Sequence, residues 1–208
     1  AAGRGSRLQS DGLPKPLFRL LGLPLIERTI VTAKRAGLED FTVVTGYDGE
    51  RIRKFLDRLA VRREVTITHV VNENWQADNG VSVLKAREAI GDEPFALLMA
   101  DHLVSPRLLS ELLDAPLREG TVCLAVDFDL RNPLVDLDDV TRVRVEGGRI
   151  EAIGKQLDDY NAFDTGCFVC SPALFDSLEL TRKRDGDETL SGGIRALAEK
   201  GRVSVHDI

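Results

Sequence analysis

The chain has 208 residues, of which 43% are hydrophobic and 30% are charged, so it is long enough to bury the core of one substantial globular domain. Its net charge of -6 argues against a general nucleic-acid binder, which would need a basic face. No apolar run approaches the roughly 20 residues of a membrane span and nothing resembles a signal peptide, so we expect a soluble domain in the cytoplasm.

A glycine-rich basic loop opens the chain. Gly3 and Gly5 let backbone N–H groups approach a ligand without side chains in the way, and Arg4, Arg7 and Lys15 place positive charge around them. Residues 1–35 contain seven Lys or Arg and two acids, an excess of +5 in an otherwise acidic chain. This local charge predicts a site for a small anionic ligand such as a polyphosphate.

Apolar, β-rich runs alternate with amphipathic stretches along most of the sequence, which predicts a doubly wound α/β layer. The spacing predicts helices over residues 24–35, 49–59, 81–90, 172–178 and 190–200, and strands over 41–45, 65–71, 95–100, 121–128, 163–170 and 203–206. A hairpin is expected from residues 140–145 and 149–153, with Gly147 and Gly148 in its turn. The charged segment 181–188 is expected to be a solvated or mobile loop.

A polar loop leads into the helix predicted over residues 81–90. Gly80 and Ser82 lie at the amino end of that helix, where backbone N–H groups are free, and the Asn79 amide carries a donor and an acceptor suited to a base edge. The alternative is that Asn79 or Ser82 only caps the helix. The sequence leaves both interpretations open.

Asp101 follows the most hydrophobic run of the chain, residues 95–100, which we expect to be a central strand. Ligands gather at the carboxyl ends of strands in open α/β sheets, so an acid there faces the cleft. Its hard oxygen suits Mg²⁺, which binds through one or two carboxylates plus substrate phosphates. The alternative is a helix cap, for which Ser105 is better placed. His102 is expected beside the metal site or in contact with substrate.

The remaining residues of metal-ligand type predict no second site. Cys167 and Cys170 form a C-x-x-C on a predicted strand, where residues three apart point to opposite faces, so we do not expect them to share a metal. Three cysteines give no disulfide framework. The aspartates between Asp127 and Asp139 lack the spacing of a calcium loop, which leaves a solvated loop as the expectation.

The opening AAGRGSRL and the later PKPL resemble the signature A-A-G-x-G-[ST]-R-L and P-K-[PA]-L of nucleotidyltransferases that join a nucleoside triphosphate to a phosphorylated sugar or alcohol. A dinucleotide fingerprint would need a third glycine at Leu8 and a P-loop would need Gly-Lys-Ser/Thr, and both fail. The resemblance implies a Rossmann-like, GT-A-type three-layer sandwich with a mostly parallel mixed central sheet. It also implies a single domain over residues 1–208, with a small acceptor-binding hairpin extension at about residues 140–166.

The resemblance further implies a role for each matching residue. Arg7, Lys15 and Lys155 would be the catalytic cations, and Asp101 would hold Mg²⁺. The nucleotide would be bound by Ala1, Ala2, Gly3, Arg4, Gly5, Ser6, Arg7, Lys15, Asn79, Gly80, Ser82 and Asp101, and the acceptor by His102, Lys155, Asp164, Thr165 and Gly166. A second metal-binding Asp, usual near the end of such domains, is expected beyond residue 208.

A closer resemblance, to the MobA-like CTP:inositol-1-phosphate cytidylyltransferases of thermophiles, runs through residues 77–86, 98–103, 154–158 and 164–166. It implies that CTP and inositol 1-phosphate give CDP-inositol for the compatible solute di-myo-inositol phosphate. It also implies fusion to a membrane-embedded CDP-alcohol phosphotransferase domain outside this chain. Both ends of the chain look cut.

Two other functions remain open. One is another nucleotidyltransferase on the same scaffold, acting on phosphocholine, a hexose phosphate or molybdopterin. The other is a non-catalytic nucleotide-binding regulatory subunit. The oligomeric state is also open, a dimer included.

Overall fold

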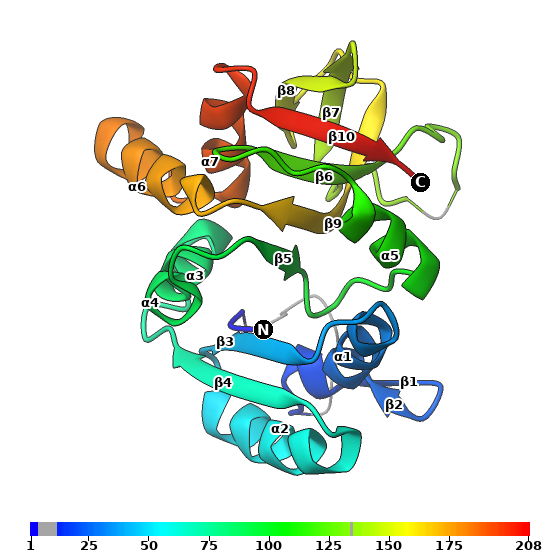
Figure 1. Cartoon of the computed structure of the whole chain (residues 1–208), viewed down its shortest axis with the longest axis vertical. Coiled ribbons are helices and arrows are strands. Elements are labelled where there is room, and N and C mark those ends of the chain that lie inside the picture. Colours follow the sequence, from blue (N-terminus) through cyan, green and yellow to red (C-terminus); the bar gives the residue numbers. More distant parts are fainter. Residues whose placement is uncertain (4–11, 134) are drawn as a thin grey trace. The chain divides into compact units, whose positions relative to one another are not determined.

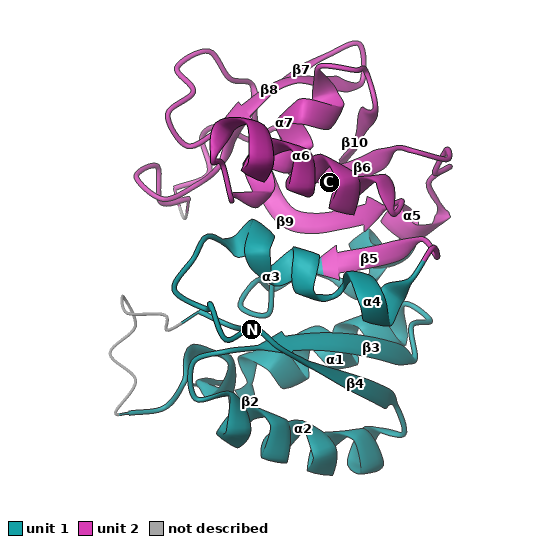
Figure 2. Cartoon of the chain, turned by 90° about the vertical axis from the view of Figure 1, so that its left-hand side faces the viewer, with its two compact units in different colours: residues 1–91, 98–110 teal, residues 92–97, 111–208 magenta. Residues whose placement is uncertain are grey.

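A computed structural model describes residues 1–3, 12–133 and 135–208. The chain divides into two compact units, one of residues 1–91 and 98–110 and the other of residues 92–97 and 111–208 (Figure 2). Arg4, Gly5, Ser6 and Arg7, which the sequence assigns to the phosphate loop, lie outside the described residues.

The first unit contains a parallel strand pair, β3 (Asp40–Thr45) and β4 (Thr66–Val71), joined by α2 (Gly49–Arg63) (Figure 1). Before it come the 3₁₀ turn η1 (Lys15–Leu17), the short hairpin β1 (Arg19–Leu20) and β2 (Leu23–Pro24), and α1 (Leu25–Arg35). Apolar residues at helical spacing on α1 and α2 supply most of the core, which comprises Leu17, Ile26, Ile30, Ile52, Leu56 and Leu59. The core therefore forms where η1 and the two predicted helices pack against side chains of β3 and β4 such as Phe41, Val43 and Ile67.

A buried carboxylate links α1 to α2. Glu27 is 2% exposed and pairs with Arg62 at 2.9 Å and with Arg63 at 2.8 Å. Two guanidinium groups compensate the desolvation of one carboxylate, so removing either partner would leave a buried charge less well paired. Helix α2 extends past the predicted residue 59 to Arg63, which is what brings these arginines to Glu27.

The helix predicted over residues 81–90 is two helices in the structure. Helix α3 runs from Asn79 to Lys85 and α4 from Arg87 to Ile90, with Ala86 between them. Asn79 and Gly80 thus belong to the first turn of α3 and not to the loop before it. Periodicity alone did not reveal the break, because Ala86 is itself buried and continues the apolar stripe.

The second unit is built on a six-stranded mixed sheet in the order β5-β9-β6-β10-β8-β7. Its strands are β5 (Phe95–Leu98), β6 (Val122–Asp127), β7 (Arg142–Glu146), β8 (Arg149–Gly154), β9 (Ala162–Cys170) and β10 (Val203–Asp207). Strands β6 and β10 are parallel, whereas β9 runs antiparallel to β6 and also pairs at its start with β7. Strand β5, predicted to be central, lies at one edge of this sheet in the described part of the chain.

Helices α6 (Ala173–Asp185) and α7 (Leu190–Ala198) pack on one another in the second unit, and α7 also packs against β8 (Figure 2). The prediction of a loop over residues 181–188 is wrong for its first five residues, which continue α6. Thr181 is only 2% exposed there, while the charged residues that follow it face solvent. A charge run marks exposure, and exposure is compatible with a helix as well as with a loop.

The expected β7–β8 hairpin is confirmed. Gly147 and Gly148 occupy its turn with φ of 55° and 75°, the left-handed conformation that a tight hairpin turn requires and that glycine adopts without strain.

Candidate active site

The start of the chain is held to the carboxyl end of β3. The Tyr47 amide donates to the Ala2 carbonyl at 2.9 Å, and Ala2 is 4% exposed. Gly46 permits this approach, because a Cβ there would overlap the Cβ of Trp75 and come within 2.9 Å of the Ala2 oxygen. The Tyr47 and Trp75 rings pack edge to face at 5.2 Å. Sequence analysis missed this anchor, whose one signal is the Gly that ends an apolar run.

Lys15 begins the turn that buries its neighbours. Pro14 precedes η1, the Leu17 amide donates to the Pro14 carbonyl at 2.8 Å, and both Pro16 and Leu17 are buried. Fixed proline φ angles favour this tight turn, and burial of Leu17 in the core fixes its direction. The Pro-Lys-Pro-Leu block therefore presents one lysine from a rigid, core-anchored base.

Asp101 lies in the turn after β5, and its carboxylate pairs with the Lys15 ammonium. The two side chains are 30% and 29% exposed. Burial alone would raise the pKa of Asp101, but the hydrogen bond and positive charge of Lys15 outweigh burial, with a smaller contribution from His102, and the pKa lies below its usual value. Asp101 is therefore a carboxylate at neutral pH, held beside a cation.

The helix-cap alternative for Asp101 is not what the structure has. Ser105 accepts a hydrogen bond from the Leu108 amide at 3.1 Å and so caps α5 (Pro106–Asp114). His102 is exposed next to Asp101, and its backbone N–H donates to the Met99 carbonyl at 3.2 Å. The Asp101 carboxylate is thus not required to cap α5.

Asn72 organises the loop before α3. It is fully buried, its side-chain amide donates to the Ser82 hydroxyl at 3.0 Å, and its side-chain oxygen accepts from the Asn74 amide at 3.0 Å. Ser82 therefore has a structural partner. Asn79 lies in the first turn of α3 and is exposed. Sequence analysis missed Asn72, because neither its burial nor its bond to Ser82 is signalled by the residues around it.

Lys155 follows β8 and pairs with Asp139 at 2.7 Å, with the side chains 54% and 37% exposed. Arg142 on β7 donates to the Leu157 and Leu137 carbonyls, each at 3.2 Å. Its guanidinium also lies 5.0 Å from the centre of the Tyr160 ring. Arg142 therefore ties the loop after Lys155 to the loop that carries Asp139.

Asp164, Thr165 and Gly166 form a bulge in β9. Gly166 has φ of 74°, and its amide donates to the Asp164 carboxylate at 2.7 Å. The Thr165 hydroxyl donates to the Ala125 carbonyl of β6 at 2.7 Å, at the point where the register of β6 and β9 shifts. The bulge re-aims the strand locally, and bulges of this kind are common beside binding sites.

The cysteines behave as core residues. Cys123, Cys167 and Cys170 are free and buried, and burial raises the pKa of Cys167 to about 12 and that of Cys170 further.

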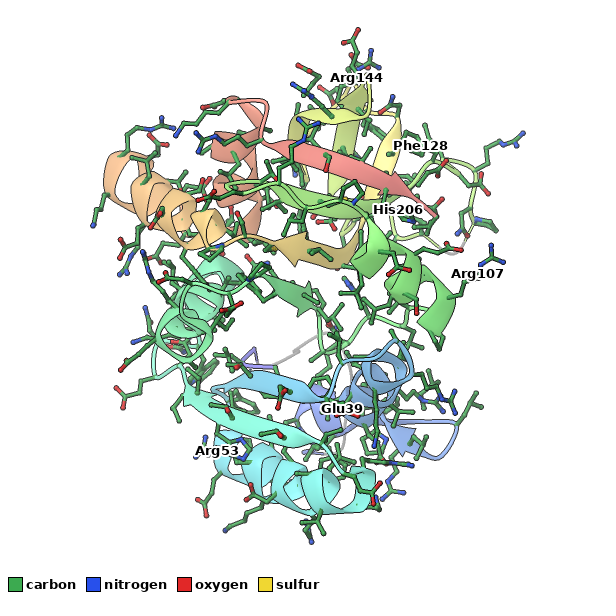
Figure 3. All side chains as sticks on the ribbon, in the orientation of Figure 1. Glu39, Arg53, Arg107, Phe128, Arg144 and His206 are labelled. Atoms are coloured by element: carbon green, nitrogen blue, oxygen red, sulfur yellow. The ribbon has the colours of Figure 1, made fainter. Side chains whose placement is uncertain are left out.

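In the described ranges, no group of three or more His, Cys, Asp or Glu is placed to hold a metal ion. His206 lies on β10 and Phe128 directly after β6, as Figure 3 shows.

Two lysine–aspartate pairs thus stand out, Lys15–Asp101 in the first unit and Lys155–Asp139 in the second. Partly exposed lysines can neutralise phosphate, and a lone ionised carboxylate suits a Mg²⁺ ion whose other ligands are phosphate oxygens and water.

Within the described residues, no helix combines the length and apolar character needed to cross a bilayer.

Residues 1–198 match the family model of the MobA-like NTP transferase domain, and the chain belongs to that family. The "Bifunctional IPC transferase and DIPP synthase" of Rubrobacter xylanophilus is 40% identical over 92% of this chain and 41% of its own length. The protein of the same name from Aquifex aeolicus is 30% identical over 100% of this chain and 45% of its own length. The chain therefore spans less than half of these curated relatives.

Solved structures give the same fold. The inositol-1-phosphate CTP transferase from T. maritima superposes with a TM-score of 0.86 at 27% identity, covering 100% of this chain and 82% of that one. A UDP-glucose pyrophosphorylase in complex with UDP-glucose has a TM-score of 0.81 at 21% identity, with coverage of 100% and 88%. The predicted α/β nucleotidyltransferase fold is confirmed.

Proposed function

We propose that this chain transfers the cytidylyl group of CTP to inositol 1-phosphate, giving CDP-inositol and pyrophosphate. The acceptor phosphate oxygen attacks the α-phosphorus of CTP, and the bond to the bridging oxygen of the β-phosphate breaks. A phosphate monoester has a second pKa of about 6, so the nucleophile carries no proton to remove at neutral pH. The step therefore requires no general base.

The observation that carries the proposal is the pairing of Lys15 with Asp101. Two sequence blocks that are far apart, the Pro-Lys-Pro-Leu turn and the end of β5, deliver a cation and a carboxylate to the same point. The reaction brings two anions together, so fixed cations and positioning contribute most of the catalysis. In this proposal Arg7 and Lys15 hold the triphosphate and Lys155 holds the acceptor phosphate.

The residues present fit a divalent cation. Asp101 is ionised and partly exposed, and a single carboxylate is a normal protein contribution to a Mg²⁺ site that phosphates complete. Mg²⁺ bound there would neutralise charge on the phosphates. Asn79, Gly80 and Ser82 are proposed to contact the nucleotide, and His102, Asp164, Thr165 and Gly166 the acceptor.

Support for the choice of CTP and inositol 1-phosphate comes from the names of similar proteins, an IPC transferase at 40% identity and an inositol-1-phosphate CTP transferase at a TM-score of 0.86. The relatives from Rubrobacter xylanophilus and Aquifex aeolicus are named bifunctional and are more than twice as long as the region they share with this chain, so we also propose that this chain is the transferase part of such a protein.

The test is pyrophosphate release by the protein with Mg²⁺, each of the four NTPs, and a panel of inositol 1-phosphate, glucose 1-phosphate and phosphocholine. We expect turnover with CTP and inositol 1-phosphate. Turnover with another pair would move the chain to a different transferase on the same scaffold. Pyrophosphate from no pair, together with measurable nucleotide binding, would indicate a regulatory subunit.

A further inference from the structure

The backbone on either side of Lys155 is held by a guanidinium group. Arg195 of α7 donates to the carbonyl of Ile153, two residues before Lys155, at 3.4 Å. Arg142 of β7 donates to the carbonyl of Leu157, two residues after it, at 3.2 Å. Both arginines bond a backbone carbonyl oxygen and so fix the path of the chain. Neither of these bonds involves the Lys155 side chain.

Arg195 is in turn oriented by Asp187, whose carboxylate lies 3.5 Å from its other terminal nitrogen. Asp187 is built into the start of α7: its Oδ1 accepts from the Thr189 amide at 2.9 Å and from the Thr189 hydroxyl at 2.6 Å. The Thr189 hydroxyl accepts from the Gly192 amide at 2.9 Å and caps the helix. The Asp187 carboxylate is therefore fixed by Thr189 independently of its contact with Arg195.

Gly192 makes this arrangement sterically feasible. A Cβ at position 192 would overlap the Asp187 carboxylate, so any side chain there would push the acid away from the start of α7. A Cβ at Gly154 would lie 3.8 Å from the guanidinium of Arg195, which is ordinary contact. The guanidinium thus lies against the backbone of residues 153 and 154, the last two residues of β8.

We propose that Arg195 and Arg142 are positioning residues for Lys155, with Asp187 orienting Arg195. This inference rests on the proposed function, in which Lys155 holds the acceptor phosphate. A flexible lysine loses side-chain entropy when it binds an anion, and a fixed backbone limits the further cost to the side chain alone. The contacts of Arg195 with Ile153 and of Arg142 with Leu157 supply that fixed backbone.

The test compares Arg195→Ala with Lys155→Met, the double variant, and Arg144→Ala as the matched control. Arg144 also lies on the β7–β8 hairpin (Figure 3), but it pairs with the exposed Asp159 at 3.2 Å. We expect Arg195→Ala to raise the KM for inositol 1-phosphate about five- to tenfold, the loss of one modest hydrogen bond, with the KM for CTP unchanged. Arg144→Ala should change neither constant, and Arg195→Lys should restore part of the loss.

The double variant separates positioning from a direct contact. Because Arg195 acts through Lys155, adding Arg195→Ala to Lys155→Met should produce no further rise in the KM for the acceptor. A full additional rise, or an equal effect on the KM for CTP, would overturn the proposal.

Hydrogen exchange provides a readout that does not depend on turnover. In Arg195→Ala the amides of residues 153–157 should exchange faster than in the wild type and in Arg144→Ala. Unchanged exchange would also overturn the proposal. If the wild-type protein released no pyrophosphate with any substrate pair but Arg195→Ala still exchanged faster, the positioning role of Arg195 would be supported and the proposed function would be contradicted.

Discussion

Both units present a lysine paired with an aspartate, but the two lysines are held in different ways. Lys15 begins a short turn whose next two residues, Pro16 and Leu17, are buried. Lys155 stands at the end of a hairpin strand, is 54% exposed, and is held through the backbone by arginines from β7 and α7. A local motif with its own hydrophobic anchor fixes the first lysine, whereas contacts distant in sequence fix the second.

The largest effect is expected at the better-anchored pair. Asp101→Asn should lower kcat for pyrophosphate release by roughly 100- to 1,000-fold, because an amide is a poor Mg²⁺ ligand and the charge compensation is lost. A thermal melt should show that the variant is folded. Wild-type turnover by the folded variant would remove Asp101 as the proposed metal ligand.

Lys155→Met is expected to act on one substrate. Loss of a charge-assisted hydrogen bond to phosphate should raise the KM for inositol 1-phosphate roughly 10- to 100-fold, with the KM for CTP unchanged. Initial-rate kinetics with each substrate varied in turn measure both constants. If the KM for CTP rose instead, the assignment of Lys155 to the acceptor would be wrong.

A smaller effect should appear in nucleotide binding without metal. In the free protein Asp101 holds Lys15, so CTP in EDTA must draw the lysine away from its partner. Asp101→Asn should therefore bind metal-free CTP about three- to tenfold more tightly than the wild type, as expected for one weakly solvent-screened ion pair. Calorimetric titration measures the affinity for metal-free CTP. Weaker binding by Asp101→Asn would contradict the idea that Lys15 leaves Asp101 to bind the nucleotide.

The smallest effect concerns stability against pH. Because Lys15 keeps the pKa of folded Asp101 below its usual value, the charged carboxylate stabilises the fold above the usual Asp pKa of about 4 and ceases to do so as pH falls through the lowered value. The difference in unfolding free energy between the wild type and Asp101→Asn, about 1 kcal/mol or less at pH 7, should vanish in that acidic range. Urea denaturation in EDTA from pH 7 to pH 2 would test it, and a difference independent of pH would contradict the ion pair as its source.

Sequence reasoning succeeded where the determining signal is local. The apolar spacing of α1, the Gly147-Gly148 turn and the acid after β5 each depend on a few neighbouring residues, and the structure has all three. It failed where the signal lies elsewhere in the chain. The contact of Arg195 with Ile153 and that of Asn72 with Ser82 arise only after helices and strands have packed, and no propensity or motif within either segment indicates them.

At the charged end of α6 the local sequence carried a signal, polarity, but the signal was misleading. The residues after Thr181 look like a loop because they are polar, yet α6 continues through Asp185 and Thr181 is buried in it. Burial of Thr181 is a property of the packed chain, and the polar sequence around it gives no sign of it.

The close approach at Gly46 sets a rule for anyone who redesigns this protein. The steric conflict that a side chain would create there is with the Cβ of Trp75, an atom that every residue except glycine possesses. Shrinking the indole to alanine would therefore not make room for a larger residue at 46. Position 46 must therefore stay glycine whichever side chain with a Cβ stands at position 75.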